Sequence, residues 1–433
     1  MSTPTEREPT PPKGTTKHRI LQTLGPGLIT GASDDDPSGI ATYSQVGAQF
    51  GYGMLWTMLF SYPLMAGIQE ISGQIGRVTG RGIAGNLRKF YHPALLYSIV
   101  FVMLVANVIN LGADLDAMGE ALSLLIGGHT LVWASGFALL CITLQVFMPY
   151  EKYAKGLKWL CAVLFAYVAT VFVVHVSWVE ALKATVLPSL QFNAAFITSI
   201  VAVLGTTISP YLFFWQAQSE VEVEQTNPTE LPLQRDPKQA PAQLHRIRVD
   251  TYIGMAFSNL IAFFIILTTA TVLNKHGIAN IATATDAAKA LEPIAGRFAF
   301  LLFSLGIIGT GLLAVPVLAG SAAYAVGETM HWRVGLNHDL RHARRFYAVI
   351  AASTVVGLGM NFLHIDPIRA LFWSAVINGV VAVPIMAMMM LLATNKAAMG
   401  DFTLSLRQKV LGFTATAVML AAAIALFMTW GKT

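Results

Sequence analysis

Three consecutive carboxylates, Asp34, Asp35 and Asp36, interrupt an otherwise apolar stretch near the start of the chain. A charged side chain at the centre of a bilayer costs about 2.5–3.5 kcal/mol or more if it faces lipid, so these groups need water, a partner or a bound cation. Pro37 follows directly and lacks the N–H that would continue a helix. The run therefore predicts a helix that breaks within the membrane, with a cation held at the break.

A second break is predicted at a similar depth in residues 205–211, where small and hydroxyl residues precede Pro210. Backbone carbonyls of an unwound segment have lost their helical partners and can point at a cation. A single proline kink is common in membrane helices, because neighbouring groups satisfy the freed backbone. Two breaks in matching positions, one beside an acidic run, instead predict a substrate site between them.

The composition of the chain indicates that the elements carrying these breaks are membrane-spanning helices. Of 433 residues, 55% are hydrophobic and 12% are charged, whereas soluble domains carry about 25% charged residues. A helix needs about 20 apolar residues to cross a bilayer. Apolar stretches fall at 20–50, 53–76, 94–125, 130–149, 157–178, 194–222, 249–273, 294–327, 346–362, 369–393 and 410–430. The sequence therefore predicts an all-α polytopic membrane protein with eleven spans.

The charges indicate how the spans are oriented. The predicted layout places 22 of the 28 lysines and arginines on one side of the membrane. Because basic loops are retained in the cytosol, we expect a cytosolic N-terminus and a multi-pass protein of the plasma membrane. The net charge of +5 then reflects topology, and nucleic acid is not an expected partner. Residues 1–19, rich in Pro and Thr, are expected to form a disordered cytosolic tail.

Breaks in the first and sixth of eleven spans match a five-plus-five inverted-repeat transporter fold with discontinuous helices 1 and 6. The first repeat is predicted over 20–178 (spans 1–5) and the second over 194–393 (spans 6–10), with an additional span 11 at 410–430. The cytosolic loop 223–247 contains several prolines among charged residues. We expect this loop to be a flexible connector and assign it no chemistry.

Specific motifs lie between residues 24 and 81. The chain reads GPGLITGASDDDPSGIATYSQVGAQFGYGMLW from Gly25, followed by Gln-Glu-Ile-Ser-Gly at 69–73 and Val-Thr-Gly-Arg at 78–81. This pattern resembles the NRAMP family of divalent-metal transporters, and the likeness in layout extends from about residue 20 to 394. The resemblance implies an inverted-repeat fold and transport of a divalent metal ion.

The resemblance can be carried over by position at the first break. It places the metal-binding Asp of the family on Asp36 and the helix-breaking Pro on Pro37. Ser38 stands where the family has Gly, and Gly39 stands where it has a metal-binding Asn. One side-chain ligand of the family is therefore missing, and Gly39 is expected to offer its backbone carbonyl.

The second break departs from the family in a similar way. Thr206 takes the place of an Ala that offers its backbone carbonyl, and Ser209 takes the place of a metal-binding Met before Pro210. The implied ligands are thus Asp36, Gly39, Thr206 and Ser209, all donating oxygen. Because thioethers suit softer metals and oxygen suits hard ions, we expect Mg²⁺ or Mn²⁺ as the transported ion, as in the divergent NRAMP-related magnesium transporters. No resident cofactor is expected.

Proton coupling is less clearly indicated. Tyr211 and Gln216 occupy the positions of two histidines that take part in proton movement in the family. Neither side chain titrates near neutral pH. On the third span, Asp116 and Glu120 lie four residues apart on one helical face, near Asp114. This pair is expected either to relay protons or to line an aqueous vestibule.

Other polar residues in the spans are candidates for the ion pathway. Asp34 and Asp35 are expected to form an outer shell that attracts cations, with one of them capping the half-helix after the break. Glu70 and Gln74 either line the inner path or make a polar contact between helices. Asn378 is a further candidate ligand on the tenth span.

Two other functions fit parts of the pattern. A sodium-coupled symporter of an amino acid or another small organic solute would use the same fold, although an acidic run would repel a carboxylate substrate. A sensor or scaffold that does not transport is harder to reconcile with buried carboxylates. The chain contains no nucleophile elbow, phosphate loop or His-Glu metal motif, so an enzyme is not expected. The expected partners are the metal ion and the bilayer, and a monomer is compatible with the sequence.

Overall fold

The computed structural model describes residues 25–148, 162–227, 229–281, 283–338, 340–363 and 365–430, and these residues fold into helices without strands. The predicted tail at 1–19 and the start of the fifth span lie outside the described residues. The longer helices are α2 (Pro26–Asp34), α3 (Pro37–Phe50), α4 (Trp56–Thr79), α5 (Ile83–Phe90), α6 (Pro93–Ile126), α7 (Thr130–Phe147), α9 (Phe165–Val173), α10 (Trp178–Val186), α11 (Ala194–Thr207), α12 (Pro210–Thr226), α13 (Ala240–Val272), α16 (Ala299–Thr329), α17 (Arg344–Gly359), α18 (Pro367–Thr394) and α20 (Leu406–Thr429). The all-α fold is confirmed.

Eight helices of the described chain are long and apolar enough to cross a membrane. The broken first span, α4 and the short helix over 162–173 are not among these eight, so eleven spans remains a prediction. The described part of each predicted stretch nevertheless contains a helix or a pair of helices. Most predicted boundaries lie within a few residues of the observed ones, although α13 begins nine residues before the predicted position 249.

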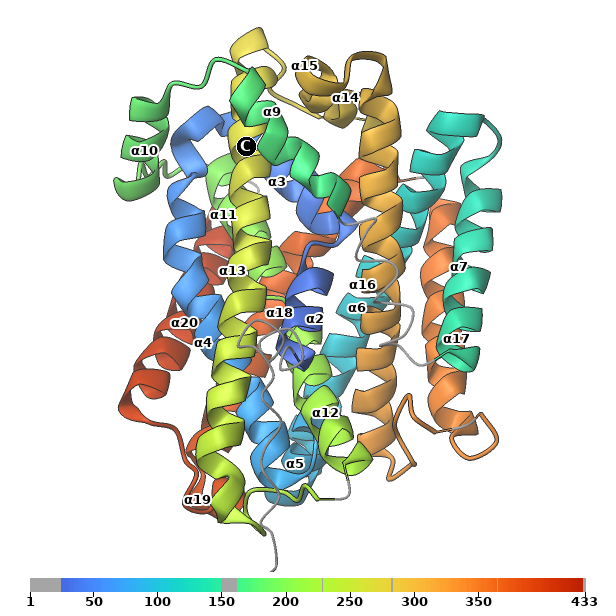
Figure 1. The fold of residues 1–433 in the computed structure, drawn as a ribbon, viewed down its shortest axis with the longest axis vertical. Coiled ribbons are helices and arrows are strands. Elements are labelled where there is room, and N and C mark those ends of the chain that lie inside the picture. Colours follow the sequence, from blue (N-terminus) through green and yellow to red (C-terminus); the bar gives the residue numbers. More distant parts are fainter. Residues whose placement is uncertain are drawn as a thin grey trace, which may run out of the picture.

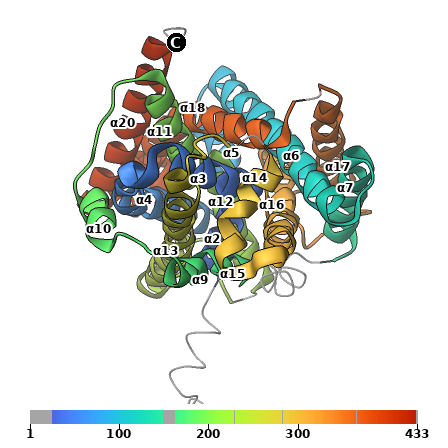
Figure 2. The same cartoon turned by 90° about the horizontal axis from the view of Figure 1, so that it is seen from above.

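The two broken helices occupy the middle of the bundle. In Figure 2, α2, α3 and α12 lie centrally, with α20 at one side and α7 and α17 at the other. Figure 1 shows α14 (Ala284–Ala288) and α15 (Glu292–Ala295) at one end of the molecule, and α5 and α19 (Lys396–Met399) at the other. By the predicted orientation, the end that carries α5 and α19 faces the cytosol.

Glycines allow the broken helices to approach their neighbours closely. A Cβ added to Gly31 of α2 would lie 2.7 Å from the Cα of Gly254 in α13. A Cβ added to Gly205 of α11 would lie 2.8 Å from the Cα of Gly379 in α18. Small residues at such crossings replace side-chain interdigitation with direct backbone packing, which is typical of membrane helices. The crossings hold both breaks within the core of the protein.

The loop predicted over 223–247 is shorter and more ordered than expected. Helix α12 continues to Thr226, and α13 already begins at Ala240. Between them, the N–H of Leu233 donates to the carbonyl of Arg77 (3.2 Å), and Glu230 forms an ion pair with the Arg77 guanidinium at 2.6 Å. The bounds of the connector were therefore predicted too wide, and the buried charge of Arg77 is compensated by these contacts.

Candidate metal site

The first break lies where the sequence predicts it. Helix α2 ends at Asp34, and α3 begins at Pro37, which occupies the first helical position, where its missing N–H costs nothing. Asp36 is the N-cap of α3 in an extended conformation. Its Oδ1 accepts hydrogen bonds from the Gly39 N–H and the Ser38 hydroxyl, each 2.7 Å long. The cap is thus Asp36 and not Asp34 or Asp35, because only the residue directly before Pro37 can reach the free N–H groups.

The second break separates α11, which ends at Thr207, from α12, which begins at Pro210. Ser209 is the N-cap by position, but its hydroxyl turns back to the carbonyls of Gly205 (3.1 Å) and Thr206 (2.9 Å). The carbonyl of Thr206 therefore already accepts one hydrogen bond. The Thr206 hydroxyl, in contrast, is buried and has no hydrogen-bond partner among the described residues.

The two breaks contact each other. The Tyr211 hydroxyl at the start of α12 donates to the carbonyl of Ser33 at the end of α2 (3.2 Å). A Cβ built on Gly39 would lie 3.0 Å from the Thr206 hydroxyl oxygen and 3.4 Å from Asp36 Oδ1. The Thr206 side chain thus occupies the space that a side chain at position 39 would need.

Gly39 has a different geometry from the predicted one. It lies in the first turn of α3, where the free backbone groups are N–H groups and the carbonyls are already paired along the helix. Gly39 therefore presents its N–H to Asp36. The expectation that it offers a carbonyl to the ion does not agree with this geometry.

Asn110 of α6 connects the break to two further helices. Its Nδ2 donates to Asp36 Oδ2 at 3.0 Å and to Asp114 Oδ2 at 3.2 Å. Its Oδ1 accepts from Nδ2 of Asn378 in α18 at 3.1 Å. Asn378 was a predicted candidate, whereas Asn110 was not identified from the sequence. Its spacing of four residues from Asp114 on one helical face was the signal available.

The predicted pair on α6 lies elsewhere. Asp116 and Glu120 are both partly exposed, and their charges interact with Asp366 at the end that carries α14. Asp114, two residues from Asp116, points to the opposite side and interacts with Asp36 through Asn110. Of the α6 carboxylates, Asp114 is therefore the one that belongs to the site.

Four carboxylates gather around the first break without a cationic side chain among them. Asp34, Asp35, Asp36 and Asp114 are 1%, 3%, 2% and 0% exposed. The ion pairs of the described residues are Arg77–Glu230, Arg246–Glu220, Arg248–Glu70 and Lys289–Asp286, and none includes a member of this group. A buried charge costs several kcal/mol unless it is compensated. The site thus has a strong electrostatic preference for a cation.

Helix ends of both signs meet at the breaks. The C-terminal ends of α2 and α11 carry partial negative charge, and the N-terminal ends of α3 and α12 carry partial positive charge, so the preference for a cation rests on the carboxylates. No three His, Cys, Asp or Glu side chains of the described residues converge as a preformed metal-binding group. An ion at this position would therefore combine Asp36 with amide, hydroxyl and carbonyl oxygens.

Asp34 and Asp35 share one hydroxyl donor. Ser258 of α13 lies 2.6 Å from Asp34 Oδ2 and 3.0 Å from Asp35 Oδ1. A hydroxyl has a single proton to donate, so only one of these carboxylates is satisfied at a time. Asp34 Oδ1 has no hydrogen-bond partner among the described residues. The pair adds negative charge beside the site without being held by a cationic side chain.

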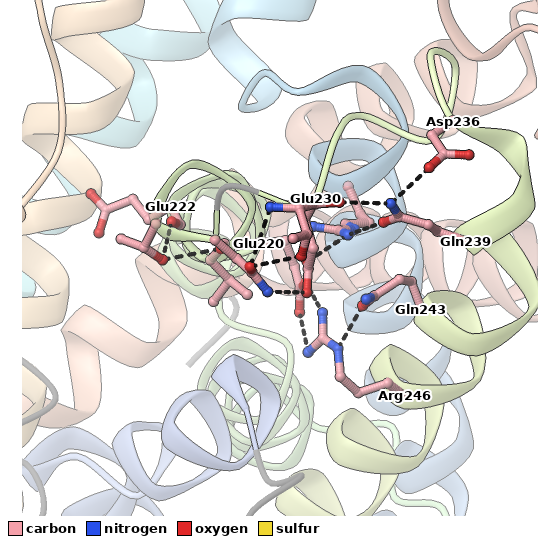
Figure 3. A network of polar contacts seen from close by, with 12 residues as sticks. Glu220, Glu222, Glu230, Asp236, Gln239, Gln243 and Arg246 are labelled. Carbon is pink, nitrogen blue, oxygen red and sulfur yellow. Dashed lines mark hydrogen bonds and ion pairs between the residues drawn. The ribbon is translucent and has the colours of Figure 1, made fainter. Parts of the chain in front are cut away.

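The predicted cytosolic side of the site is closed by polar contacts. The N–H groups of Gly27 and Leu28, at the start of α2, donate to the Asp250 carboxylate at 2.7 and 3.1 Å. Arg246, one turn before Asp250, forms an ion pair with Glu220 of α12. Figure 3 shows this network, in which Glu220, Gln243 and Arg246 lie together and Gln239 bonds to Asp236. These contacts hold α2, α12 and α13 together below the breaks.

The other predicted pathway residues make contacts between helices. The Gln216 side-chain oxygen accepts from the Thr30 hydroxyl of α2 at 2.5 Å. Glu70 pairs with Arg248 at 2.9 Å and accepts from Gln408 of α20 at 3.1 Å. For Glu70, the geometry agrees with the interhelical-contact alternative.

Comparisons with known proteins identify the family of the chain. The family model described as "Natural resistance-associated macrophage protein-like" matches residues 27–429. A divalent metal cation transporter MntH of Acidiphilium cryptum is 28% identical over 388 residues, covering 87% of this chain and 83% of the relative. An MntH of Caldanaerobacter subterraneus is 25% identical over 430 residues, covering 95% and 94%.

A solved structure shares the fold. The crystal structure of a manganese transporter from Eremococcus coleocola, in complex with an aromatic bis-isothiourea substituted compound, superposes with a TM-score of 0.75 at 16% identity, covering 96% of this chain and 89% of the other. The homologous proteins are divalent metal cation transporters by name and not enzymes. The family match extends over almost the whole chain, broken helices included, and the protein therefore belongs to the Nramp family of membrane transporters.

Proposed function

We propose that this protein carries a hard divalent cation, Mg²⁺ or Mn²⁺, across the plasma membrane by alternating access, with its N-terminus in the cytosol. The observation that carries the proposal is the group of buried carboxylates Asp34, Asp35, Asp36 and Asp114, which has no cationic side chain as a partner in the described chain. A small doubly charged ion is the ligand that such a group would bind most favourably.

In this proposal, Asp36 supplies the negative charge that binds the ion. Asn110 contacts Asp36 from α6 and has a side-chain amide, the group that the family carries at the position of Gly39. We propose that its oxygen replaces the missing amide ligand, while the Thr206 hydroxyl lies beside Gly39 and Asp36 at the first break. The Ser209 hydroxyl already donates to the carbonyls of Gly205 and Thr206, so it would contribute less to ion binding than its position in the sequence suggests.

The choice of ion follows from the donor atoms. Carboxylate, amide, hydroxyl and water oxygens suit Mg²⁺ and Mn²⁺, whereas the missing thioether would have favoured softer metals. Mg²⁺ also retains several waters when it binds proteins, which fits a site with few charged ligands. The solved relative is a manganese transporter by name, and the substitutions at Gly39 and Ser209 favour the divergent magnesium branch.

Alternating access requires that the contacts on the inner side open. The Glu220–Arg246 pair and the bonds from Asp250 to the start of α2 lie between the breaks and the predicted cytosolic end. Breaking them would release α2 and α12 from α13. The alternative of a sodium-coupled symporter for an amino acid is not favoured, because the family comprises metal transporters and the acidic site would repel a carboxylate.

The test is ion uptake into proteoliposomes. Asp36→Asn keeps the N-cap, since Asn caps helices as well as Asp, but it removes the charge. We expect Mg²⁺ and Mn²⁺ uptake to fall to background, while Asp401→Asn, at an exposed loop carboxylate, keeps full uptake. Unchanged uptake by a folded Asp36→Asn protein would refute the proposal. A pH-sensitive dye inside the vesicles reports whether protons accompany the metal.

A further inference from the structure

A hollow opens at the predicted cytosolic end of the molecule, between α5 and the end of α16. Its volume is about 430 Å³. Its lining consists of Arg81, Gly85, Arg88, Lys89, Glu328, His331, Trp332 and Val334. In Figure 1, α5 lies at the same end of the molecule as α19, whereas α3 lies towards the opposite end, and no residue of the metal site lines the hollow. The hollow is therefore separate from the transport site.

The hollow carries a surplus of positive charge. Arg81, Arg88 and Lys89 face one acidic residue, Glu328. The Glu328 carboxylate is already used, because it accepts hydrogen bonds from the N–H groups of Gly82 (2.7 Å) and Gly85 (2.9 Å) at the start of α5. None of the ion pairs in the described part of the chain includes the three cations, although the Arg88 guanidinium donates to the Glu328 carbonyl at 3.2 Å and contacts His331. An anion is thus the ligand that this lining would attract.

Aromatic groups place the hollow at the level of the lipid headgroups. The ammonium of Lys89 lies 4.9 Å from the centre of the Phe90 ring, and the Arg345 guanidinium lies 5.5 Å from that of Trp332. Just beyond α5, Leu95 and Tyr97 on the first turn of α6 expose 46% and 53% of their surface. Aromatic residues with basic neighbours mark the interface between the hydrocarbon core and the cytosol.

We propose that this hollow binds the phosphate headgroup of an anionic phospholipid from the cytosolic leaflet. Guanidinium groups bind phosphate oxygens through paired hydrogen bonds, and basic pockets between membrane helices on the cytosolic side suit such headgroups. The acyl chains would lie along the apolar surface of α6. Helix α5 links α4 to α6 along the chain, and the N–H of Gly82 directly before α5 donates to Glu328 of α16. A bound lipid would therefore stabilise the cytosolic ends of α4, α6 and α16.

The binding test is native mass spectrometry of the purified full-length protein. The protein is released into the mass spectrometer from vesicles that contain phosphatidylglycerol and phosphatidylcholine in equal amounts. We expect one retained phosphatidylglycerol and no retained phosphatidylcholine. In Arg88→Gln/Lys89→Gln, retention should weaken at least about tenfold, because a lost hydrogen bond to a charged phosphate lowers affinity by about that factor or more.

A matched double variant controls for general attraction to an anionic membrane. Lys238→Gln/Lys396→Gln removes two exposed charges at the same end of the molecule and should retain the lipid as the unchanged protein does. Equal retention by both double variants would overturn the proposal. If sn-glycerol 3-phosphate, which has no acyl chains, raised the melting temperature as much as phosphatidylglycerol does, the proposal would also be overturned, because the ligand would then be a free phosphate. Uptake by the Arg88→Gln/Lys89→Gln protein in neutral lipid verifies that it is folded.

Discussion

Replacing Asn110 with Ala tests whether the amide of α6 is a ligand or only a hydrogen-bond donor. In the structure, the Asn110 amide donates to Asp36 and Asp114 and accepts from Asn378. If its oxygen turns to the ion, its loss must weaken ion binding. Loss of a donor that only orients the carboxylates also weakens binding, so weaker binding is required of a ligand, and the rescue experiment below decides between the two roles. Unchanged or tighter binding would exclude the ligand role.

The size of the effect follows from the bonds that the Asn110 amide makes. Groups that support a metal site typically contribute 10–100-fold in affinity, so we expect Mg²⁺ and Mn²⁺ to bind about 10–100 times more weakly to Asn110→Ala. Each hydrogen bond to a charged group is also worth about 1.5–3 kcal/mol, so the metal-free protein should unfold at a lower temperature. Calorimetric titration measures the first effect, and thermal melting measures the second.

Asn107→Ala is the matched control. Asn107 lies one turn from Asn110 on α6, is equally buried, and donates to the carbonyl of Leu318 at 3.0 Å without contacting Asp36. Its loss should lower stability but leave ion affinity within a factor of about three. A fall in affinity shared by both variants would mean that the helix, and not the amide, had been disturbed.

A rescue experiment makes the test stricter. The family carries its amide at the position of Gly39, where an added Cβ would lie only 3.0 Å from the Thr206 hydroxyl oxygen. Gly39→Asn combined with Thr206→Ala should therefore recover part of the ion binding lost in Asn110→Ala, since Thr206→Ala also removes a hydroxyl of the site, whereas Gly39→Asn alone should recover none. Unchanged or tighter binding by Asn110→Ala, or no recovery in the folded triple variant, would refute the assignment of Asn110 as a ligand.

Three further predictions concern the rest of the site. Ser209→Met introduces a thioether at the second break and should raise the affinity for Cd²⁺ relative to Mg²⁺ at least about tenfold, measured by competitive titration; an unchanged ratio would show that position 209 does not reach the ion. Glu220→Gln removes the carboxylate that pairs with Arg246, and breaking a buried ion pair costs about 3–5 kcal/mol. The inner side should then open more often. A membrane-impermeant reagent added from the cytosolic side should label Thr30→Cys at least tenfold faster in the Glu220→Gln protein than in the protein that carries Thr30→Cys alone. Asp34→Asn removes one uncompensated negative charge and should raise the melting temperature of the metal-free protein by a few degrees; a lower value would indicate that Asp34 is already neutralised.

The breaks were predictable because their cause is local. A proline that follows a run of small or polar residues cannot continue a helix, and the structure begins α3 at Pro37 and α12 at Pro210. The approximate helix boundaries were also predictable, because they depend on the length of each apolar stretch. The fold and the position of Asp36 were therefore accessible from short segments of sequence.

The residues that were missed depend on contacts between distant segments. Asn110 lies 74 positions from Asp36, and Asp250 lies 223 positions from the Gly27 amide that it caps. Helical spacing on α6 selected Asp116 and Glu120, although the same spacing also joins Asn110 to Asp114. Only the packing of α6 against α3 decides which of these faces meets the break, and no local pattern contains that information.

Charge balance limits how an ion can occupy this site. A divalent ion beside Asp36 and Asp114 would cancel two negative charges and leave Asp34 and Asp35 with one shared hydroxyl between them. Two bare carboxylates in a buried site repel each other, so at least one must hold a proton or face a second cation when the metal is bound. If the proposed site holds a divalent ion in this way, Asp34 and Asp35 would couple metal occupancy to another positive charge, although Tyr211 and Gln216 do not titrate near neutral pH.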